Sequence, residues 1–296
     1  MLTMKDLLFS FGILHDKRYR EKEKRQYRHL LKVQMASVGY TLKEKRKDSS
    51  FLGTKNSCTN LFTDNIEDAR VVVIANYDTP MKQWLHTDRY AFYPPQQKGN
   101  VILNLLVPCI LFLLTMTVLM FYTIPAYQAG RSMMLVGSIL IGIVGFSLVR
   151  YTRSGLAQKG NKIYNTSGVL TSLMIAQQLS EKDKNKVAFA FVDDGCQTQL
   201  GARLLKESLN GSSCIRVYLD SIGNKGDMVC MGHVRPDLLP EVHERPSDLE
   251  HLGDLLVTCG QLENDKVRVY KDDVFQMENI EICSKTILSW LEKIKE

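Results

Sequence analysis

Residues 164–207 read YNTSGVLTSLMIAQQLSEKDKNKVAFAFVDDGCQTQLGARLLKE, and this stretch decides the fold. Apolar side chains at helical spacing favour a helix over residues 167–182. The continuous run KVAFAFV at 186–192 is typical of a strand that is buried on both faces of a sheet. A second helix is expected over residues 197–208. A strand between two helices favours an α/β fold with a mostly parallel sheet.

The segments on either side repeat this alternation. The run ARVVVIA at 69–75 is the strongest predicted strand, because consecutive β-branched residues are typical of a central strand. Further strands are predicted at 37–43, 59–62, 213–219, 227–231 and 266–270, and helices at 16–32, 247–259 and 277–295. The predicted fold class is therefore α/β, with a mostly parallel mixed central sheet flanked by helices.

Two uncharged segments interrupt this pattern. Val101–Pro125 exceeds the roughly 20 residues that a helix needs to cross a bilayer, and Met133–Val149 reaches the lower limit of about 17. Because a short polar turn joins them, they predict an inserted transmembrane helical hairpin over residues 101–150. The alternative interpretation is a hairpin that is buried in a protein core.

The hairpin is expected to be an insertion in the sequence of a single α/β domain. Residues 17–100 and 151–296 are expected to form a single discontinuous domain, since an even number of spans returns the chain to the same side of the membrane. Residues 1–16 form an amphipathic segment. They are expected either to lie on the membrane surface or to pack on the domain.

Basic residues beside the spans predict the orientation. The flanks carry Lys82, Arg89, Lys98, Arg150, Arg153, Lys159 and Lys162, whereas the connecting turn carries only Arg131. Lys and Arg concentrate on the cytoplasmic side of membrane proteins. The chain is therefore expected to be an integral protein of the cell membrane with two spans and a cytoplasmic soluble domain. The bilayer is then its first partner. Glycines in the second span permit close packing with a second copy of the chain.

The composition excludes several classes of protein. The chain has 296 residues, of which 45% are hydrophobic and 24% charged, so it is not a disordered low-complexity protein. Its seven cysteines are too sparse for a disulfide scaffold, and none forms a C-x-x-C pair. The net charge of +6 is accompanied by no aromatic-basic motif, which argues against nucleic acid as a partner.

The order of these segments resembles the double-zinc aminopeptidase family, which includes bacterial aminopeptidases, glutamate carboxypeptidase, glutaminyl cyclase and transferrin-receptor-like domains. VVVIANYDTP at 71–80, the stretch 164–207 and VYLDSIG at 217–223 carry the resemblance. It covers most of residues 20–85 and 155–296. The resemblance implies a zinc-exopeptidase-like fold. It also implies a site in which carboxylate and imidazole ligands hold two zinc ions beside a glutamate general base.

The first half of that site is altered in this sequence. The family's His-x-Asp motif, in which the histidine binds metal and the aspartate orients it, corresponds to Asn76-Tyr77-Asp78. The bridging aspartate before Asn-x-Ser-Gly corresponds to Tyr164, which Asn165 follows. The resemblance therefore implies that only the orienting aspartate of this half is kept.

The second half is altered in the same way. The adjacent glutamates, general base and then ligand, correspond to Gly195 and Cys196. The next ligand is kept as Asp220, and the last histidine corresponds to Tyr270. Of the five metal ligands that the resemblance implies, only Asp220 survives, and a glycine replaces the general base.

These replacements predict a membrane-anchored, catalytically inactive, aminopeptidase-like protein without a cofactor. Its role would be to bind or scaffold a peptide or a membrane protein. The alternative is a metal-dependent peptidase or cyclase-like hydrolase. In that case Cys196 and Asp220, with Asp193 or Asp194, would hold one zinc ion, or Cys196 would act as a nucleophile. A transporter subunit is a third, weaker hypothesis, because neither span carries a charge.

A structural interpretation exists for each singled-out residue. Asp78 and Asp220 can serve as hydrogen-bond acceptors at strand ends, and the Ser167-Gly168 pair can be an ordinary helix start. Tyr77, Tyr164 and Tyr270 are expected to fill the space that the zinc ions would take.

Overall fold

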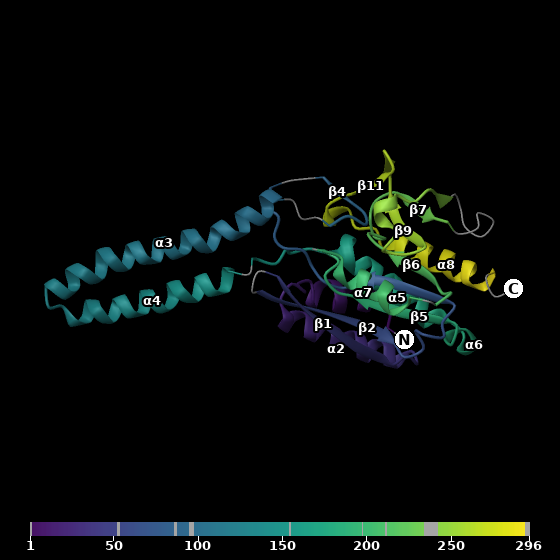
Figure 1. Ribbon diagram of the computed structural model, residues 1–296, viewed down its shortest axis with the longest axis horizontal. Coiled ribbons are helices and arrows are strands. Elements are labelled where there is room, and N and C mark those ends of the chain that lie inside the picture. The colour runs from purple at the N-terminus through teal and green to yellow at the C-terminus, as the bar shows by residue number, and fades with distance from the viewer. Residues whose placement is uncertain are drawn as a thin grey trace. The chain divides into compact units, whose positions relative to one another are not determined.

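The computed structural model describes residues 2–51, 54–85, 88–94, 98–153, 155–196, 198–210, 212–233 and 242–293 (Figure 1). These residues form two compact units. Unit 1 comprises residues 1–80, 87–95 and 158–296, and unit 2 comprises residues 81–86 and 96–157.

Unit 1 contains a mixed eight-stranded sheet in the order β1-β2-β5-β3-β6-β9-β7-β8. The strands are β1 (Leu42–Phe51), β2 (Thr54–Thr63), β3 (Val71–Asn76), β5 (Val187–Val192), β6 (Ile215–Leu219), β7 (Asp227–Gly232), β8 (Val242–His243) and β9 (Leu255–Gly260). The central strands β5, β3, β6 and β9 run parallel to one another. A small second sheet joins β10 (Leu262–Glu263), β11 (Lys266–Val269) and β4 (Arg89–Tyr90). The predicted α/β class with a mostly parallel sheet is confirmed.

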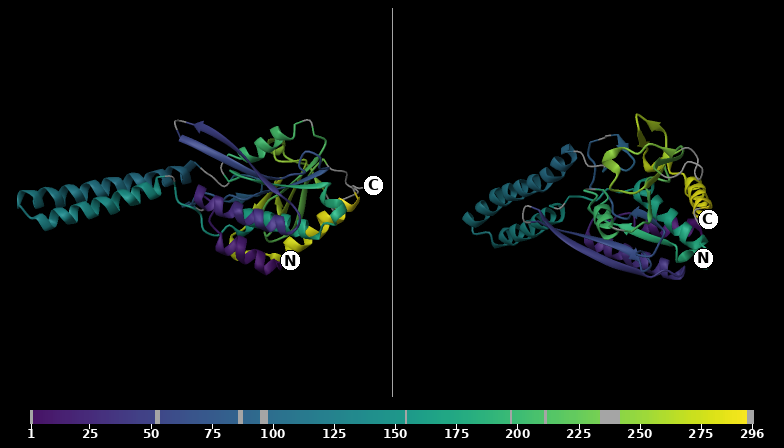
Figure 2. Two further views of the ribbon diagram at one scale, coloured as in Figure 1. Left: turned by 90° about the horizontal axis from the view of Figure 1, so that it is seen from below. Right: turned by 45° about the vertical axis from the view of Figure 1, so that its right-hand side comes forward.

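Helices cover both faces of the large sheet (Figures 1 and 2). One core cluster includes Val71, Val73 and Ala75 of β3 and side chains of the helices α1 (Met4–Leu7), η1 (Leu8–Leu14), α2 (Glu21–Ser37), α5 (Ser167–Gln178) and α8 (Met277–Lys293). Val72 and Ile74 face the opposite cluster, to which α7 (Leu200–Ser208) contributes. The short helices α6 (Glu181–Lys184), η2 (Lys162–Thr166), η4 (Ser247–Leu249) and η5 (Asp272–Val274) complete unit 1.

The N-terminal residues belong to the core of unit 1. Leu7, Phe11 and Tyr27 are fully buried. The guanidinium of Arg18 is also buried; it donates to the carbonyls of Phe11 and His15 at 3.0 and 3.1 Å and to Thr166 Oγ1 at 2.9 Å. The segment therefore packs on the domain, which was one of the two placements expected from the sequence.

Two sequence predictions are wrong. The expected strand at 37–43 lies at the end of α2 and in the turn after it, and the strand itself is β1. The β1–β2 hairpin was missed because LKEKRKDSSF is too polar to suggest a strand. The helix expected at 247–259 is a 3₁₀ turn followed by β9, because six consecutive residues there are buried between the two core clusters.

Unit 2 consists mainly of two antiparallel helices, α3 (Lys98–Gln128) and α4 (Ser132–Thr152). Both are long and apolar enough to cross a membrane, and little of either is buried within the protein. The glycines of α4 are used inside this hairpin: a Cβ at Gly145 would lie 2.3 Å from Thr115, and one at Gly137 would lie 3.3 Å from Tyr122. The close packing expected of these glycines therefore occurs between α3 and α4.

Candidate functional site

The candidate site lies at the carboxyl ends of three neighbouring parallel strands. The chain continues from β3 into Tyr77 and Asp78, from β5 into residues 193–196, and from β6 into Asp220. Because these strands are parallel neighbours, their ends meet at one edge of the sheet, where α/β proteins usually place their ligands. The start of α5, with Tyr164 and Asn165 just before it, lies at the same edge.

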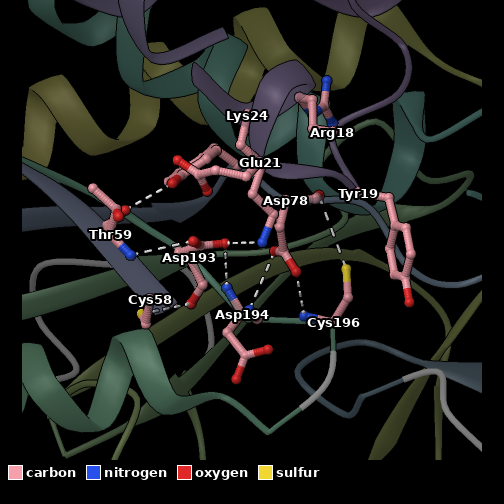
Figure 3. A network of polar contacts seen from close by, with 12 residues as sticks. Arg18, Tyr19, Glu21, Lys24, Cys58, Thr59, Asp78, Asp193, Asp194 and Cys196 are labelled. Atoms are coloured by element: carbon pink, nitrogen blue, oxygen red, sulfur yellow. Dashed lines mark hydrogen bonds and ion pairs between the residues drawn. The ribbon is translucent and has the colours of Figure 1, made fainter. Parts of the chain in front are cut away.

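Asp78 fixes the loop that follows β5 (Figure 3). Its Oδ1 accepts the backbone N–H of Gly195 at 3.2 Å and its Oδ2 accepts that of Cys196 at 3.1 Å. Asn165 Nδ2 also reaches Asp78 Oδ1, at 3.3 Å. Burial raises the pKa of Asp78 to about 7, in spite of the opposing charge of Lys24. Both carboxylate oxygens therefore bond to the protein itself.

The side chain of Asn76 fills the space in which a side chain at position 195 would lie. A Cβ built on Gly195 would lie 2.1 to 2.2 Å from the carboxamide atoms of Asn76, far inside van der Waals contact. In the resemblance described from the sequence, these two positions are those of the histidine ligand and the general base. The Asn76 side chain thus fills the space that a glutamate side chain at position 195 would need.

Cys196 is a buried thiol. It has no exposed surface, and its Sγ receives a hydrogen bond from Asn165 Nδ2 at 3.0 Å. Burial and the neighbouring Asp78 raise the pKa of Cys196 well above its ordinary value, so the thiolate that a nucleophile or zinc ligand needs is disfavoured. No described histidine is hydrogen-bonded to this thiol.

Tyr164 and Asp220 both hold the segment that follows β4. Tyr164 is buried and donates from its hydroxyl to the carbonyl of Tyr93 at 2.8 Å. Asp220 Oδ2 accepts the backbone N–H of Phe92 at 2.6 Å, and its Oδ1 accepts Ser221 Oγ at 3.0 Å. Burial raises the pKa of Asp220 to about 7.

Gln199 and His251, two residues that the sequence did not single out, extend this support. Gln199 Nε2 donates to the carbonyl of Phe92 at 2.6 Å, and His251 Nε2 lies 2.8 Å from Gln199 Oε1. His251 is therefore only partly exposed. A chain of polar contacts thus leads from His251 to the Phe92 backbone.

Lys24 supplies the positive charge of the site, a role that no pattern in the sequence indicates. Its ammonium lies 2.5 Å from Asp193 Oδ1, while Asp193 Oδ2 accepts the backbone N–H of Thr59 at 3.2 Å (Figure 3). Burial alone would lower the pKa of Lys24, but the carboxylates of Asp193, Asp78 and Asp194 raise it. The lysine therefore stays charged within an acidic cluster.

Two of the predicted residues point elsewhere. Tyr77 stacks on Tyr27 in the core cluster that contains Val71 and Val73, with ring centroids 6.2 Å apart, and donates to the carbonyl of Thr59 at 2.7 Å. Tyr270 lines a separate polar depression with Lys225, Asp227 and other residues. Of the three tyrosines expected to fill the site, only Tyr164 lies there. Tyr218 of β6 is a buried neighbour that the sequence reading missed.

The residues present do not fit a pair of zinc ions. Asn76, Tyr164 and Gly195 offer no carboxylate or imidazole, and the oxygens of Asp78 and Asp220 are already engaged by donors from the protein. Within the described ranges, no three His, Cys, Asp or Glu side chains converge in a way that could hold a metal ion.

Comparison with solved structures shows the fold. The chain is similar to Porphyromonas gingivalis glutaminyl cyclase, with a TM-score of 0.56 and 11% identity over 98% of both chains. A Zn-dependent exopeptidase from Parabacteroides distasonis gives 0.56 and 12% identity, over 98% of this chain and 97% of that one. Macrostomum lignano glutaminyl cyclase gives 0.57 and 11%, over 99% and 89%.

No protein-family profile matches the sequence, and no curated protein matches it. At 11 to 12% identity, the structural neighbours establish that the chain has a zinc-exopeptidase-like fold. The resemblance stated from the sequence is thereby supported at the level of the fold.

The contact between Asn76 and Gly195 predicts a coupled pair of substitutions. We expect Gly195→Ala to destabilise unit 1 by about 1–3 kcal/mol, because the new methyl group overlaps the Asn76 side chain. Asn76→Ala removes that overlap, so the double variant should recover part of the loss. Thermal unfolding of the four proteins measures the coupling. Purely additive effects would contradict this contact.

The buried Asp220 predicts a pH dependence of stability. Its pKa rises from the ordinary 3.8 to about 7 on folding, so the folded chain binds more protons between these values. The contribution of Asp220 to stability is present in full below about pH 4 and is lost as the pH rises to about 7. We expect Asp220→Asn to flatten the stability profile between pH 5 and pH 7 and to raise stability at pH 8.

Asp254→Asn provides the matched control. Burial alone would raise the pKa of Asp254, but hydrogen bonds and an ion pair with Arg216 lower it. Removing this carboxylate should therefore lower stability at pH 8. If Asp220→Asn lowers stability at pH 8, the claim that burial raises the pKa of Asp220 is contradicted.

Proposed function

We propose that this chain is a membrane-anchored, zinc-exopeptidase-like protein that has lost metal catalysis and acts by binding or scaffolding a peptide or a membrane protein. One observation carries the proposal. The side chains at the strand ends are bonded to one another and to the backbone, where a metalloenzyme would hold metal ligands free.

The anchoring rests on α3 and α4. Their length and composition suit two spans, and the basic residues that flank them favour a cytoplasmic location for unit 1 in the cell membrane. The bilayer is the partner that these helices require. Any peptide or protein partner would bind at the edge of the sheet where the fold normally places ligands.

The second candidate is a metal-dependent hydrolase or cyclase whose site is remodelled around Cys196 and Asp220. It is favoured by the structural neighbours, which are glutaminyl cyclases and a Zn-dependent exopeptidase. This function would require the Asp220 carboxyl to ionise and to leave the Phe92 backbone, and it would require Cys196 to ionise inside the core.

Metal content and activity together separate the two candidates. The full chain is purified in detergent with zinc supplied, beside a Cys196→Ala, Asp220→Ala double variant. The first function predicts substoichiometric metal in both proteins, with no metal-dependent release of amino acids and no cyclisation of N-terminal glutamine. About two zinc ions per chain with such activity would contradict it. One zinc ion that the double variant loses would support the second candidate.

A further inference from the structure

The outer face of the N-terminal helix is apolar. Leu2, Phe9, Ile13 and Leu14 expose 42%, 53%, 50% and 61% of their surface. They lie within one short stretch that includes α1 and η1. Isolated apolar residues are common on protein surfaces, but four within thirteen residues of a well-packed helix are a concentrated patch.

The stretch that carries this patch is fixed to the core by buried side chains and hydrogen bonds. Met4, Leu7 and Phe11 of the same stretch are buried in the core, and Phe11 packs edge-on against Tyr27 at 5.4 Å. Arg18 fastens the end of the stretch through the carbonyls of Phe11 and His15. The exposed side chains therefore stand on a preformed surface, and their apolar area has no partner among the described residues.

Basic side chains are exposed in the same stretch and on α2, whose Tyr27 packs against Phe11 of η1. Figure 2 shows α1, η1 and α2 side by side in purple, and Lys22 and Arg25 lie on the exposed face of α2, while Lys5 lies in α1. No described carboxylate forms an ion pair with these three residues. Asp6 caps its own helix through Thr3 and stays exposed, and Glu21 binds Arg28 at 2.7 Å. Residues 2–25 hold seven Lys and Arg against four Asp and Glu, so the charge of this segment is net positive.

An exposed apolar stretch in a segment of net positive charge has the composition of an interfacial membrane contact. The apolar side chains enter the boundary between headgroups and acyl chains, and the cations attract anionic lipids. A protein partner would favour a flat or grooved surface with aromatic anchors and paired charges. The chain also passes directly from unit 1 into α3 and α4, so unit 1 meets the bilayer at a high effective concentration.

We propose that this N-terminal surface, formed by Leu2, Phe9, Ile13 and Leu14 with Lys5, Lys22 and Arg25, inserts into the interface of a bilayer that contains anionic phospholipid. The inference rests on the proposed anchoring by α3 and α4. It adds a second contact, made by unit 1 itself, which would restrict the orientation of that unit at the membrane.

The test places a tryptophan in the patch of the full chain. Phe9→Trp is reconstituted in vesicles of phosphatidylcholine alone or with 30% phosphatidylglycerol, in each case with and without brominated acyl chains, which quench tryptophan at short range. The emission of Trp84 and Trp290 is subtracted by means of the wild-type protein. Leu262→Trp, at an exposed apolar position of β10, is the matched control.

We expect brominated anionic vesicles to quench the tryptophan at position 9 at least twofold more than the one at position 262. The Lys22→Glu, Arg25→Glu double change should remove most of that difference. Equal and weak quenching at both positions would overturn the proposal. Quenching that is the same with and without phosphatidylglycerol would overturn the role of anionic lipid. If the tryptophan at position 9 stays shielded from water in detergent and becomes exposed on dilution, a second copy of the chain covers the surface, and the proposed bilayer contact is overturned.

A parallel measurement keeps this result separate from the anchoring itself. Vesicles are washed with alkaline carbonate and floated, which retains only proteins with true membrane spans. A chain that floats but shows no quenching at position 9 contradicts the surface contact alone. A chain that is released contradicts the proposed anchoring.

Discussion

The carboxylate of Asp78 is the constraint on which the rest of the site depends. It lies at the end of β3, it is buried, and it accepts the backbone N–H groups of Gly195 and Cys196 after β5. Two strand ends are thus joined without a metal ion. A buried carboxylate is costly unless it is hydrogen-bonded and its charge is balanced. The two backbone N–H groups supply the hydrogen bonds, and the cation of Lys24 contributes to balancing the charge.

The replacements at the strand ends support one another. Asn76 fills the space beside Gly195, Tyr164 reaches the backbone of Tyr93, and Asp220 holds Phe92. Each of these groups would have to leave an existing bond or contact before it could serve metal chemistry. These packing and hydrogen-bond interactions hold the edge of the sheet, in a fold similar to that of glutaminyl cyclases and exopeptidases.

Local patterns predicted the strands that are buried on both faces of the sheet and the two long apolar helices. The runs at 69–75 and 186–192 correspond to β3 and β5, and the two uncharged segments correspond to α3 and α4. Strand β1 was missed because its sequence is mostly polar, whereas residues 59–62 of β2 were predicted. The segment at 255–260 was misread because a short apolar run can suit a helix or a strand, and only the neighbouring β6 and β7 decide.

Only the site residues that correspond to motifs of the resembled family could be predicted from the sequence. The alignment of strand ends indicated Asn76, Asp78 and Asp220, but Tyr270 lies in another depression, and no local signal connects Lys24 with Asp193, 169 positions away in the chain. In sequence, Lys24 is one cation in a mixed charged helix. Its role becomes visible only when α2 is packed on the sheet.

Thermal unfolding of Lys24→Met, with and without zinc, tests the central claim that the protein's own cation stabilises this site. Exposed Lys22→Met on the same helix is the control. We expect the Lys24 variant to lose about 3–5 kcal/mol, since it leaves the buried Asp193 carboxylate without its partner. Zinc should leave the wild-type melting temperature unchanged. A Lys24→Met protein as stable as Lys22→Met, with a wild-type protein that zinc stabilises by several degrees, would contradict the account.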